Sequence, residues 1–200
     1  MEQQPSVDGT RLAPQDYLAA FDAELEALLA AATDLGADVP GCPGWTVRDL
    51  LSHVLGVYRH KNAAFAAGAA PEDVDGGWGA LADGDDPVAL VRAEAAVLRA
   101  HLDRDPATPA WSWWPPEQTV GFTRRMQTYE ATMHRVDAEL TARIPVGPMA
   151  SDVATGAVDH AVDVMWAWQP EGATYVRDAV VEFVAADTGA HWLVEVGRWA

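Results

Sequence analysis

Cysteine is almost absent from this sequence, because Cys42 is the only one among 200 residues. A single thiol excludes an internal disulfide and agrees with a reducing compartment. Long apolar runs are missing too. The longest, at residues 27–32 and 63–70, are short and rich in alanine, so neither is expected to span a bilayer. The acidic N-terminus does not have the pattern of a signal peptide. These absences together predict a cytoplasmic protein.

Basic residues are scarce, with 13 lysines and arginines against 30 aspartates and glutamates, and the formal net charge is −17. The largest basic cluster is the pair Arg124-Arg125. An excess of negative charge repels nucleic-acid phosphates and anionic lipid heads. We therefore expect neither a nucleic-acid partner nor a membrane partner.

Common catalytic and nucleotide-binding motifs are missing as well. The sequence has no GxSxG, no P-loop and no GxGxxG, and it suggests no Ser-His-Asp arrangement. What it does have is apolar material, since half of the residues are hydrophobic. Two hundred residues of this composition can bury a sizeable core in one domain, or in one domain with a small appendage.

Apolar residues recur at spacings of three and four through most of the chain, which is the period of amphipathic helices. Thr46 and Asp49 predict a capping box at the start of the second helix. Residues 1–13 are polar and are expected to be a flexible terminus. The predicted fold is mainly α, with a helical bundle over residues 14–170. Its helices are predicted at about 14–36, 46–68, 87–105, 120–143 and 151–168.

The period changes to that of strands after Tyr175. Residues 179–186 and 191–196 are predicted to be two strands of a hairpin, joined by a turn at 187–190. A lone two-stranded hairpin is marginally stable in water. We therefore expect the segment 175–200 to pack on the helices, on another subunit or on strands that this chain does not contain. A homodimer formed through this hairpin is one hypothesis.

The fourth predicted helix carries three potential metal ligands beside its apolar stripe. Glu130 and His134 lie about 40° apart on a helix, and Asp137 lies within about 20° of Glu130. Asp137 can bind a metal itself or accept a hydrogen bond from a ligand imidazole, and we favour the second interpretation. The stripe itself, which we expect to face the core, is Phe122, Met126, Tyr129, Met133, Val136 and Leu140.

His53 is the expected third ligand. It lies in an apolar helix, where a histidine is costly to bury without a partner, and antiparallel helices of a bundle can bring it opposite Glu130 and His134. Two imidazoles and one carboxylate with an open fourth position form the ligand set of catalytic zinc sites. His60, by contrast, is interpreted as a partly exposed helix histidine.

Other side chains allow two interpretations each. The tryptophans at 111, 113 and 114 form either a pocket wall or a plug at the end of the bundle, and Trp78 is expected to fold back over a pocket. Arg124 and Arg125, with Trp113, are candidates for cofactor binding, the alternative for the arginines being a solvated helix face. Cys42 is interpreted as a buried turn residue rather than a nucleophile.

Two segments, CPGWTVRDLLSHVLG at 42–56 and RMQTYEATMHRVDAE at 125–139, resemble the mycothiol-dependent maleylpyruvate isomerase family. This family lies within the DinB-like four-helix bundle superfamily, and the resemblance covers about residues 14–168. It implies a divalent metal, usually zinc, on the positions matching His53, Glu130 and His134. It also implies mycothiol, the thiol of actinobacteria, as cosubstrate. Residues 180–196 resemble the opening strands of the family's small C-terminal α/β domain, which is expected to be shortened here.

The resemblance also implies a reaction. A thiolate held by the metal adds to an electrophilic carbon of a small molecule, giving either S-transfer or cis–trans isomerisation of a maleylpyruvate-like substrate. The alternative from another class is a metal-binding bundle without catalysis, acting as a carrier, a sensor or a partner subunit.

Overall fold

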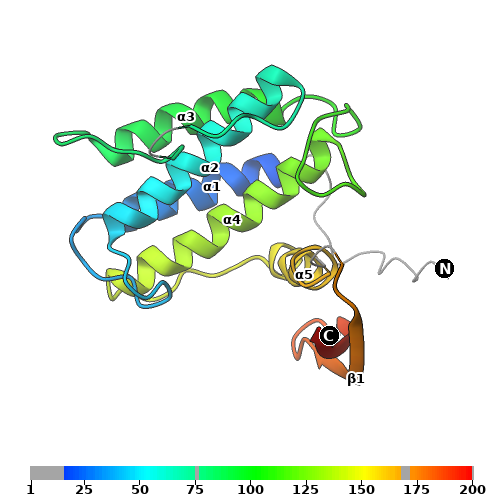
Figure 1. The fold of residues 1–200 in the computed structure, drawn as a ribbon. Coiled ribbons are helices and arrows are strands. Elements are labelled where there is room, and N and C mark those ends of the chain that lie inside the picture. Colours follow the sequence, from blue (N-terminus) through cyan, green and yellow to red (C-terminus); the bar gives the residue numbers. More distant parts are fainter. Residues whose placement is uncertain (1–15, 75–76, 168–171, 200) are drawn as a thin grey trace. The chain divides into compact units, whose positions relative to one another are not determined.

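The computed structural model describes residues 16–74, 77–167 and 172–199. The predicted flexible terminus at 1–13 and the predicted helix end at Pro170 lie outside these residues. The chain is mainly α, as predicted, and ends in an antiparallel hairpin (Figure 1). The elements are α1 (Asp16–Ala31), α2 (Val47–Ala67), α3 (Pro87–Leu102), α4 (Val120–Thr141), α5 (Ser151–His160), a π-helical turn (Ala161–Met165), β1 (Tyr175–Val184) and β2 (His191–Trp199).

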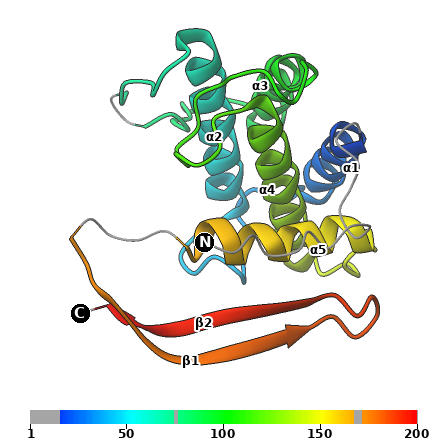
Figure 2. The ribbon, with the colours of Figure 1, turned by 90° about the vertical axis from the view of Figure 1, so that its right-hand side faces the viewer.

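Helices α1 to α4 form the bundle. α1 packs mainly against α4 and α2 against α3, while α2 and α4 also touch and run in opposite directions (Figures 1 and 2). This arrangement puts the first half of α2 beside the middle of α4, where the candidate ligands lie. The largest fully buried apolar side chains are Phe21, Leu28, Leu50, Leu51, Leu55, Tyr58, Leu98, Leu102 and Phe122.

The predicted capping box at the start of α2 is present. The hydroxyl of Thr46 accepts the backbone N–H of Asp49, and the Asp49 carboxylate accepts the backbone N–H of Thr46. The other end is closed by Gly68 in the left-handed conformation, at φ 65°. These two caps fix the register of the helix that carries His53.

The predicted apolar stripe of α4 is wrong in its second half. Phe122, Met126 and Tyr129 are buried as expected, but Met133 and Leu140 are 54% and 46% exposed. The buried positions after Tyr129 are instead Ala131, Thr132, Arg135, Ala138 and Glu139. After Tyr129, the residues of α4 that face the core are therefore not those that the heptad spacing predicts.

Several polar side chains on the buried face of α4 have hydrogen-bond or ion-pair partners, which lowers the cost of burying them. The Thr128 and Thr132 hydroxyls donate to the carbonyls four residues earlier, those of Arg124 and Thr128. Arg135 pairs with Glu24 of α1 at 2.5 Å and with Glu139 at 3.1 Å. The position of α4 is therefore set partly by a buried ion-pair network with α1.

Packing divides the chain into two compact units, one from Pro14 to Pro148 and the other containing Met149–Ala200. The fifth helix thus groups with the hairpin, whereas the sequence-based boundary follows residue 170. In the second unit Trp192 of β2 donates to Asp159 of α5 at 2.6 Å. The hairpin is present with longer strands than predicted, and Val181 pairs with Val194 in its centre.

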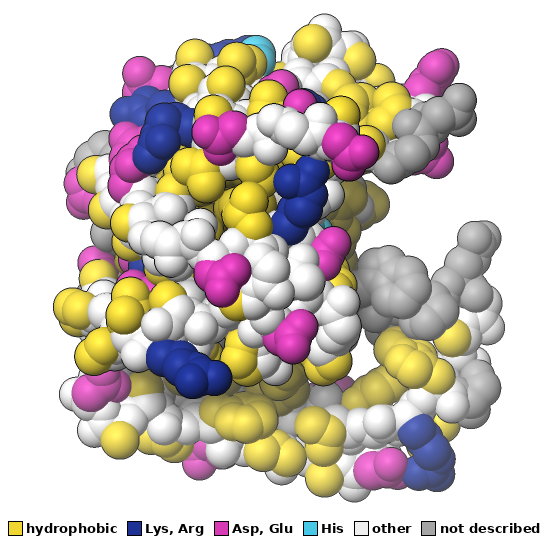
Figure 3. All heavy atoms as spheres, turned by 90° about the vertical axis from the view of Figure 1, so that its left-hand side faces the viewer, with side chains coloured by type: hydrophobic (Ala, Val, Ile, Leu, Met, Phe, Trp, Pro, Cys, Tyr) yellow, Lys and Arg dark blue, Asp and Glu magenta, His cyan; other side chains and the backbone are white. Residues whose placement is uncertain are grey.

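No helix among the described residues is long and apolar enough to cross a membrane. On the face drawn in Figure 3, the described basic side chains are scattered among acidic, apolar and uncharged ones and form no continuous basic area.

Candidate metal centre

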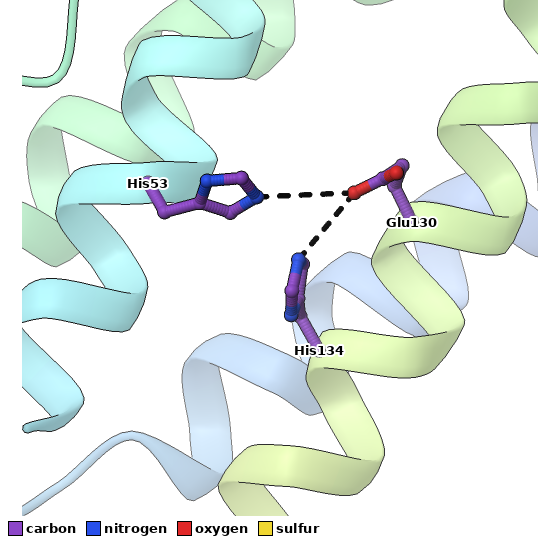
Figure 4. A group of neighbouring side chains, drawn as sticks. All are labelled: His53, Glu130 and His134. Atoms are coloured by element: carbon purple, nitrogen blue, oxygen red, sulfur yellow. Dashed lines mark ion pairs between the residues drawn. The ribbon is translucent and has the colours of Figure 1, made fainter. Parts of the chain in front are cut away.

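His53 of α2 and Glu130 and His134 of α4 converge at one point between the two helices (Figure 4). Glu130 Oε2 lies 3.4 Å from His134 Nε2 and 4.0 Å from His53 Nε2. The two imidazole rings meet edge to face, with centroids 5.0 Å apart. One ligand atom from each residue lies within 4.8 Å of the others. The structure thus brings together the three residues that the sequence had indicated.

This spacing suits a small divalent ion. A tetrahedral zinc with ligands at about 2.0–2.2 Å holds its ligand atoms about 3.3–3.6 Å apart. The 3.4 Å separation already meets that value, whereas the 4.0 Å separation, and any others up to the 4.8 Å limit of the set, would shorten on binding. Two nitrogens and one carboxylate oxygen are also donors that zinc accepts. The residues present therefore fit a divalent metal.

Asp137 supports the centre from behind His134. Its Oδ2 lies 3.1 Å from His134 Nδ1, the ring nitrogen that faces away from Glu130. Burial by itself would lower the pKa of His134, but the hydrogen bonds and charges of Glu130 and Asp137 outweigh burial and raise it. This geometry matches the favoured interpretation of Asp137 as a hydrogen-bond acceptor for a ligand imidazole.

Glu130 is held as a carboxylate. Burial would raise its pKa, yet the hydrogen bonds and charges of His134 and His53 lower the pKa to about 2. His53 and Glu130 nevertheless keep 37% and 38% of their side-chain surface exposed. The centre combines an ionised ligand with access for another molecule.

The turn before α2 packs against His53 and against Asp137, the hydrogen-bond partner of His134. A Cβ on Gly41 would lie 2.5 Å from Asp137 Oδ1, so only glycine lets the turn approach that carboxylate. The Cys42 thiol lies 3.9 Å from Asp137 Oδ2, and the Trp45 ring lies 5.2 Å from the His53 ring. The segment that the sequence had marked as a turn therefore packs directly on the centre.

Comparison with known proteins identifies the family of this chain. Residues 18–139 match the model of the mycothiol maleylpyruvate isomerase N-terminal domain, which is more than half of the chain. The chain belongs to this family. No curated protein and no solved structure gives a match. The matched segment contains all three candidate ligands, and the family is mycothiol-associated and isomerase-like, which implies a small-molecule thiol as a substrate.

In this member of the mycothiol maleylpyruvate isomerase family, a cavity of about 400 Å³ opens beside His53. One wall is α2 and the other is the loop at 78–80. Ser52 Oγ donates to the Gly79 carbonyl at 2.8 Å, and a Cβ on Gly56 would lie 2.9 Å from the Gly79 nitrogen. The prediction that Trp78 folds back over a pocket is confirmed, because Trp78 lines this cavity.

Trp111 and Trp113 of the tryptophan cluster make different contacts. Trp111 lies over α2, with its ring 5.9 Å from the His60 ring and 6.0 Å from Lys61 Nζ. Trp113 instead donates to Met126 Sδ at 3.2 Å and packs edge to face on Phe122. Trp113 therefore packs on the start of α4 as a plug does, whereas a role for Trp111 as a pocket wall stays a prediction.

Both arginines of the predicted cofactor site bond to other parts of the protein. Arg124 is buried and donates to the carbonyls of Leu102 and Arg104. Arg125 pairs with Glu117 at 2.6 Å and is about one-third exposed. Arg124 therefore anchors the end of α3, which is not the solvated face considered as its alternative. A role for Arg124, Arg125 or Trp113 in cofactor binding stays a prediction.

Three buried polar side chains near the centre were missed by the sequence analysis. Tyr58 and Lys61 lie on α2, and Gln127 lies on α4, each at most 7% exposed. Tyr58 and Gln127 occupy apolar helical positions that reveal nothing about their contacts. One signal was available, because Lys61 is the only lysine in the chain.

Proposed function

We propose that this protein is a divalent-metal-dependent enzyme that uses mycothiol against an electrophilic small molecule. His53, Glu130 and His134 would hold the metal, and zinc is the ion that this donor set suits best. The observation that carries the proposal is the convergence of three ligand atoms within 4.8 Å next to an open cavity.

The chain's own residues prepare the centre in three ways. Asp137 fixes the ring of His134 so that Nε2 faces Glu130. Ionised Glu130 supplies one negative charge, which offsets part of the charge of a cation. Between α2 and α4, the side chains lining the gap behind Glu130 and His134 leave no room for a water-sized sphere. A thiol would therefore approach from the cavity side, past His53 and Trp78.

A divalent metal bound there would keep a thiol sulfur deprotonated at neutral pH. A thiolate so held would use its electron pair to form an S–C bond while the C=C π bond of an unsaturated substrate breaks and its electrons move to the neighbouring carbon. S-transfer would result when that carbon takes up a proton and the S–C bond is retained. Cis–trans isomerisation would result when the adduct rotates about the former double bond, the double bond forms again and the sulfur leaves as thiolate.

The second candidate is a metal-binding bundle without catalysis, acting as a carrier, a sensor or a partner subunit. The narrow gap behind Glu130 and His134 favours it, because a site closed on the core side is also suited to retaining an ion. Both candidate functions use the same metal ligands, so only the binding of a thiol and the conversion of a substrate distinguish them.

The ligand assignment is tested by metal analysis of protein purified without chelators. We expect about one divalent ion per chain in the wild type and loss of most of it in His134→Ala. His101→Ala is the matched control, since that ring stacks on Phe65 at 4.8 Å, and it should retain the metal. Full retention in His134→Ala would overturn the assignment.

Enzyme and carrier are separated with the metal-loaded protein. Calorimetry should detect mycothiol binding, and incubation with mycothiol and candidate electrophiles should give conjugates or isomers visible by mass spectrometry and chromatography. Chelation should abolish both signals. Metal retention without any thiol binding would favour the non-catalytic bundle.

A further inference from the structure

The two candidate histidine ligands are held in place by different means. Asp137 accepts a hydrogen bond from Nδ1 of His134 at 3.1 Å, and the His134 side chain is only 14% exposed. His53 is 37% exposed, and no described residue accepts a hydrogen bond from its Nδ1. The outer nitrogen of a metal-binding histidine almost always donates to such an acceptor, which fixes the ring. The orientation of the His53 ring therefore depends on other contacts.

Two aromatic rings contact the ring of His53. One belongs to His134, with centroids 5.0 Å apart, and the other is the indole of Trp45, with centroids 5.2 Å apart and planes inclined by 48°. His134 is a candidate ligand itself, so Trp45 supplies the described ring contact from outside the ligand set. Aromatic rings at this separation attract each other. Trp45 is thus placed to restrict the rotation of the His53 side chain.

Trp45 is itself anchored by the backbone of the turn before α2. Its N–H donates to the Cys42 carbonyl at 3.0 Å, and its carbonyl accepts the N–H of Val39 at 2.9 Å. The next residue, Thr46, is the N-cap of α2 and forms the capping box. The indole also packs against the hydrophobic core. The turn therefore holds this ring in a fixed place relative to the helix that carries His53.

An indole and a carboxylate affect a neighbouring imidazole differently. Asp137 accepts the Nδ1 proton of His134 and adds a negative charge beside the centre. Trp45 restricts the His53 ring but supplies no carboxylate and no charge. His53 also lines the open cavity beside α2. Contact with an indole therefore orients the imidazole on the open side of the centre without changing the charge there.

We propose that Trp45 is a positioning residue for the metal centre. Its ring holds the imidazole of His53 so that Nε2 faces Glu130, the arrangement drawn in Figure 4. Because the imidazole is restrained before the ion arrives, less rotational freedom is lost on binding and the affinity is higher. The restraint also fixes the direction from which His53 reaches the ion, and so the coordination geometry. The inference rests on the ligand set of the proposed function, but not on its thiol or its electrophile.

Trp45 has a structural role as well, because it packs against the core. A purely structural role predicts that a smaller side chain lowers the melting temperature and leaves the centre of the folded protein unchanged. A positioning role predicts that the centre changes in protein that is still folded, and that another aromatic ring restores it. The behaviour of folded variants therefore separates the two roles.

Zinc affinity, measured by competition with a chromogenic chelator, gives the first test. Trp45→Leu keeps an apolar side chain but loses the ring, and its affinity should fall about tenfold or more, as for other residues that orient a ligand. Trp45→Phe keeps a ring and should retain most of the wild-type affinity. Phe65→Leu is the matched control, because the Phe65 ring also stacks on a histidine, His101, which is not a candidate ligand. Its zinc affinity should equal that of the wild type.

The visible spectrum of the cobalt-loaded protein gives the second test, because it reports the coordination geometry of the ion. At saturating cobalt, the bands of Trp45→Leu should differ from those of the wild type, and those of Trp45→Phe should match them. A lower melting temperature for Trp45→Leu together with wild-type zinc affinity and a wild-type cobalt spectrum would overturn the proposal. Equal losses of zinc affinity in Trp45→Leu and Trp45→Phe would also overturn it, because the ring would then not matter.

A third measurement uses the wild-type protein and needs no variant. Nuclear Overhauser contacts between the Trp45 indole and the His53 ring should be present in the metal-free protein and should persist after zinc is added. Their absence from the metal-free protein would overturn the proposal, whether or not Trp45→Leu folds.

The outcomes also distinguish the positioning role from the proposed function. Weaker zinc binding by Trp45→Leu, without mycothiol binding by the wild type, would refute the thiol-using enzyme and leave the positioning role standing. Mycothiol binding and conjugate formation by the wild type, with unchanged zinc affinity in Trp45→Leu, would leave the enzyme standing and refute the positioning role.

Discussion

Asp137 Oδ2 lies 3.1 Å from Nδ1 of His134. A carboxylate can only accept, so Nδ1 of His134 carries the proton of this hydrogen bond and Nε2 lies on the opposite side of the ring. That nitrogen is the one 3.4 Å from Glu130. Asp137 thereby orients the ring so that Nε2 faces Glu130, and a metal bound there would displace the Nε2 proton that the raised pKa of His134 favours in the metal-free protein.

Removal of Asp137 should weaken metal binding. Without the acceptor on Nδ1, the ring of His134 loses both its orientation and part of its basicity, and such partners are worth about 10–100-fold in metal affinity. Competition with a chromogenic chelator would measure the drop in Asp137→Ala. Glu26→Ala, an exposed carboxylate on α1, is the control. Equal affinities in the two variants would remove Asp137 from its supporting role.

A methyl group at Gly41 should disturb the same carboxylate. The added Cβ would lie 2.5 Å from Asp137 Oδ1, so the turn or the side chain must shift. We expect Gly41→Ala to lower the free energy of unfolding by about 1–3 kcal/mol, the range for overpacked sites, and to weaken metal binding. Urea unfolding measures the first effect. Gly36→Ala, whose Cβ would meet its nearest atom at 3.7 Å, should change little; equal losses in both variants would contradict this account.

The metal-free protein should lose stability toward both acid and alkaline pH. The pKa of His134 is raised from 6.5, so its contribution is complete below that value and disappears as the pH rises through the raised pKa. The pKa of Glu130 is lowered from 4.5 to about 2, so its contribution holds above 4.5 and disappears as the pH falls toward 2. Urea unfolding in the presence of a chelator at pH 3, 6 and 9 measures the loss of stability toward acid and toward alkaline pH. His134→Gln should reduce the loss of unfolding free energy between pH 6 and pH 9. An unchanged loss would contradict the stabilising interaction of His134 with Glu130 and Asp137.

Cys42 should react slowly with alkylating reagents. Burial raises the pKa of its thiol, and the charge and hydrogen bond of Asp137 raise it further, so less thiolate is present at pH 8 than in a free cysteine. Iodoacetamide labelling followed by mass spectrometry gives the rate. Asp137→Asn should speed labelling by lowering the pKa. A wild-type rate equal to that of a small free thiol would show that the thiol is not held in this way.

The hairpin should mediate a homodimer, which is the hypothesis drawn from the sequence. Val180, Val184 and Leu193 are 52%, 61% and 58% exposed on β1 and β2, and an apolar strand surface of this kind tends to pair. Light scattering should give about twice the chain mass of 21.4 kDa. Leu193→Lys, opposite Glu182 in the register, should give monomers with the hairpin intact. Val97→Lys on α3 is the control, and a monomeric wild type would end this proposal.

The sequence predicted the helices of the bundle well where burial follows the helical period, as in α1 and the caps of α2. It failed along the second half of α4, because the buried face there is decided by a partner from elsewhere. Arg135 is buried only because Glu24 of α1 meets it. No local pattern shows a contact between residues so far apart in the chain, and the apolar Met133 was the more natural choice for the core.

The candidate site was predictable to the extent that its chemistry is local. Glu130 and His134 lie one turn apart, and a histidine in an apolar helix made His53 the natural third member. Lys61 and Gln127 gave no comparable signal, because a lysine or glutamine in a helix is usually solvated. That both side chains are buried appears only in the folded structure.

The loop wall of the cavity has a further property. Gly79 rests on the Ser52 carbonyl, and Gly56 allows that approach because neither residue has a side chain. The side chains of Ser52 and Arg59 on α2 also hold the wall, and they donate to the main-chain carbonyls of Gly79, Trp78 and Ala80. These bonds end on the backbone of the loop, so an exchange of the Ala80 side chain removes none of them. The cavity can therefore be reshaped for different molecules while the metal ligands remain in place.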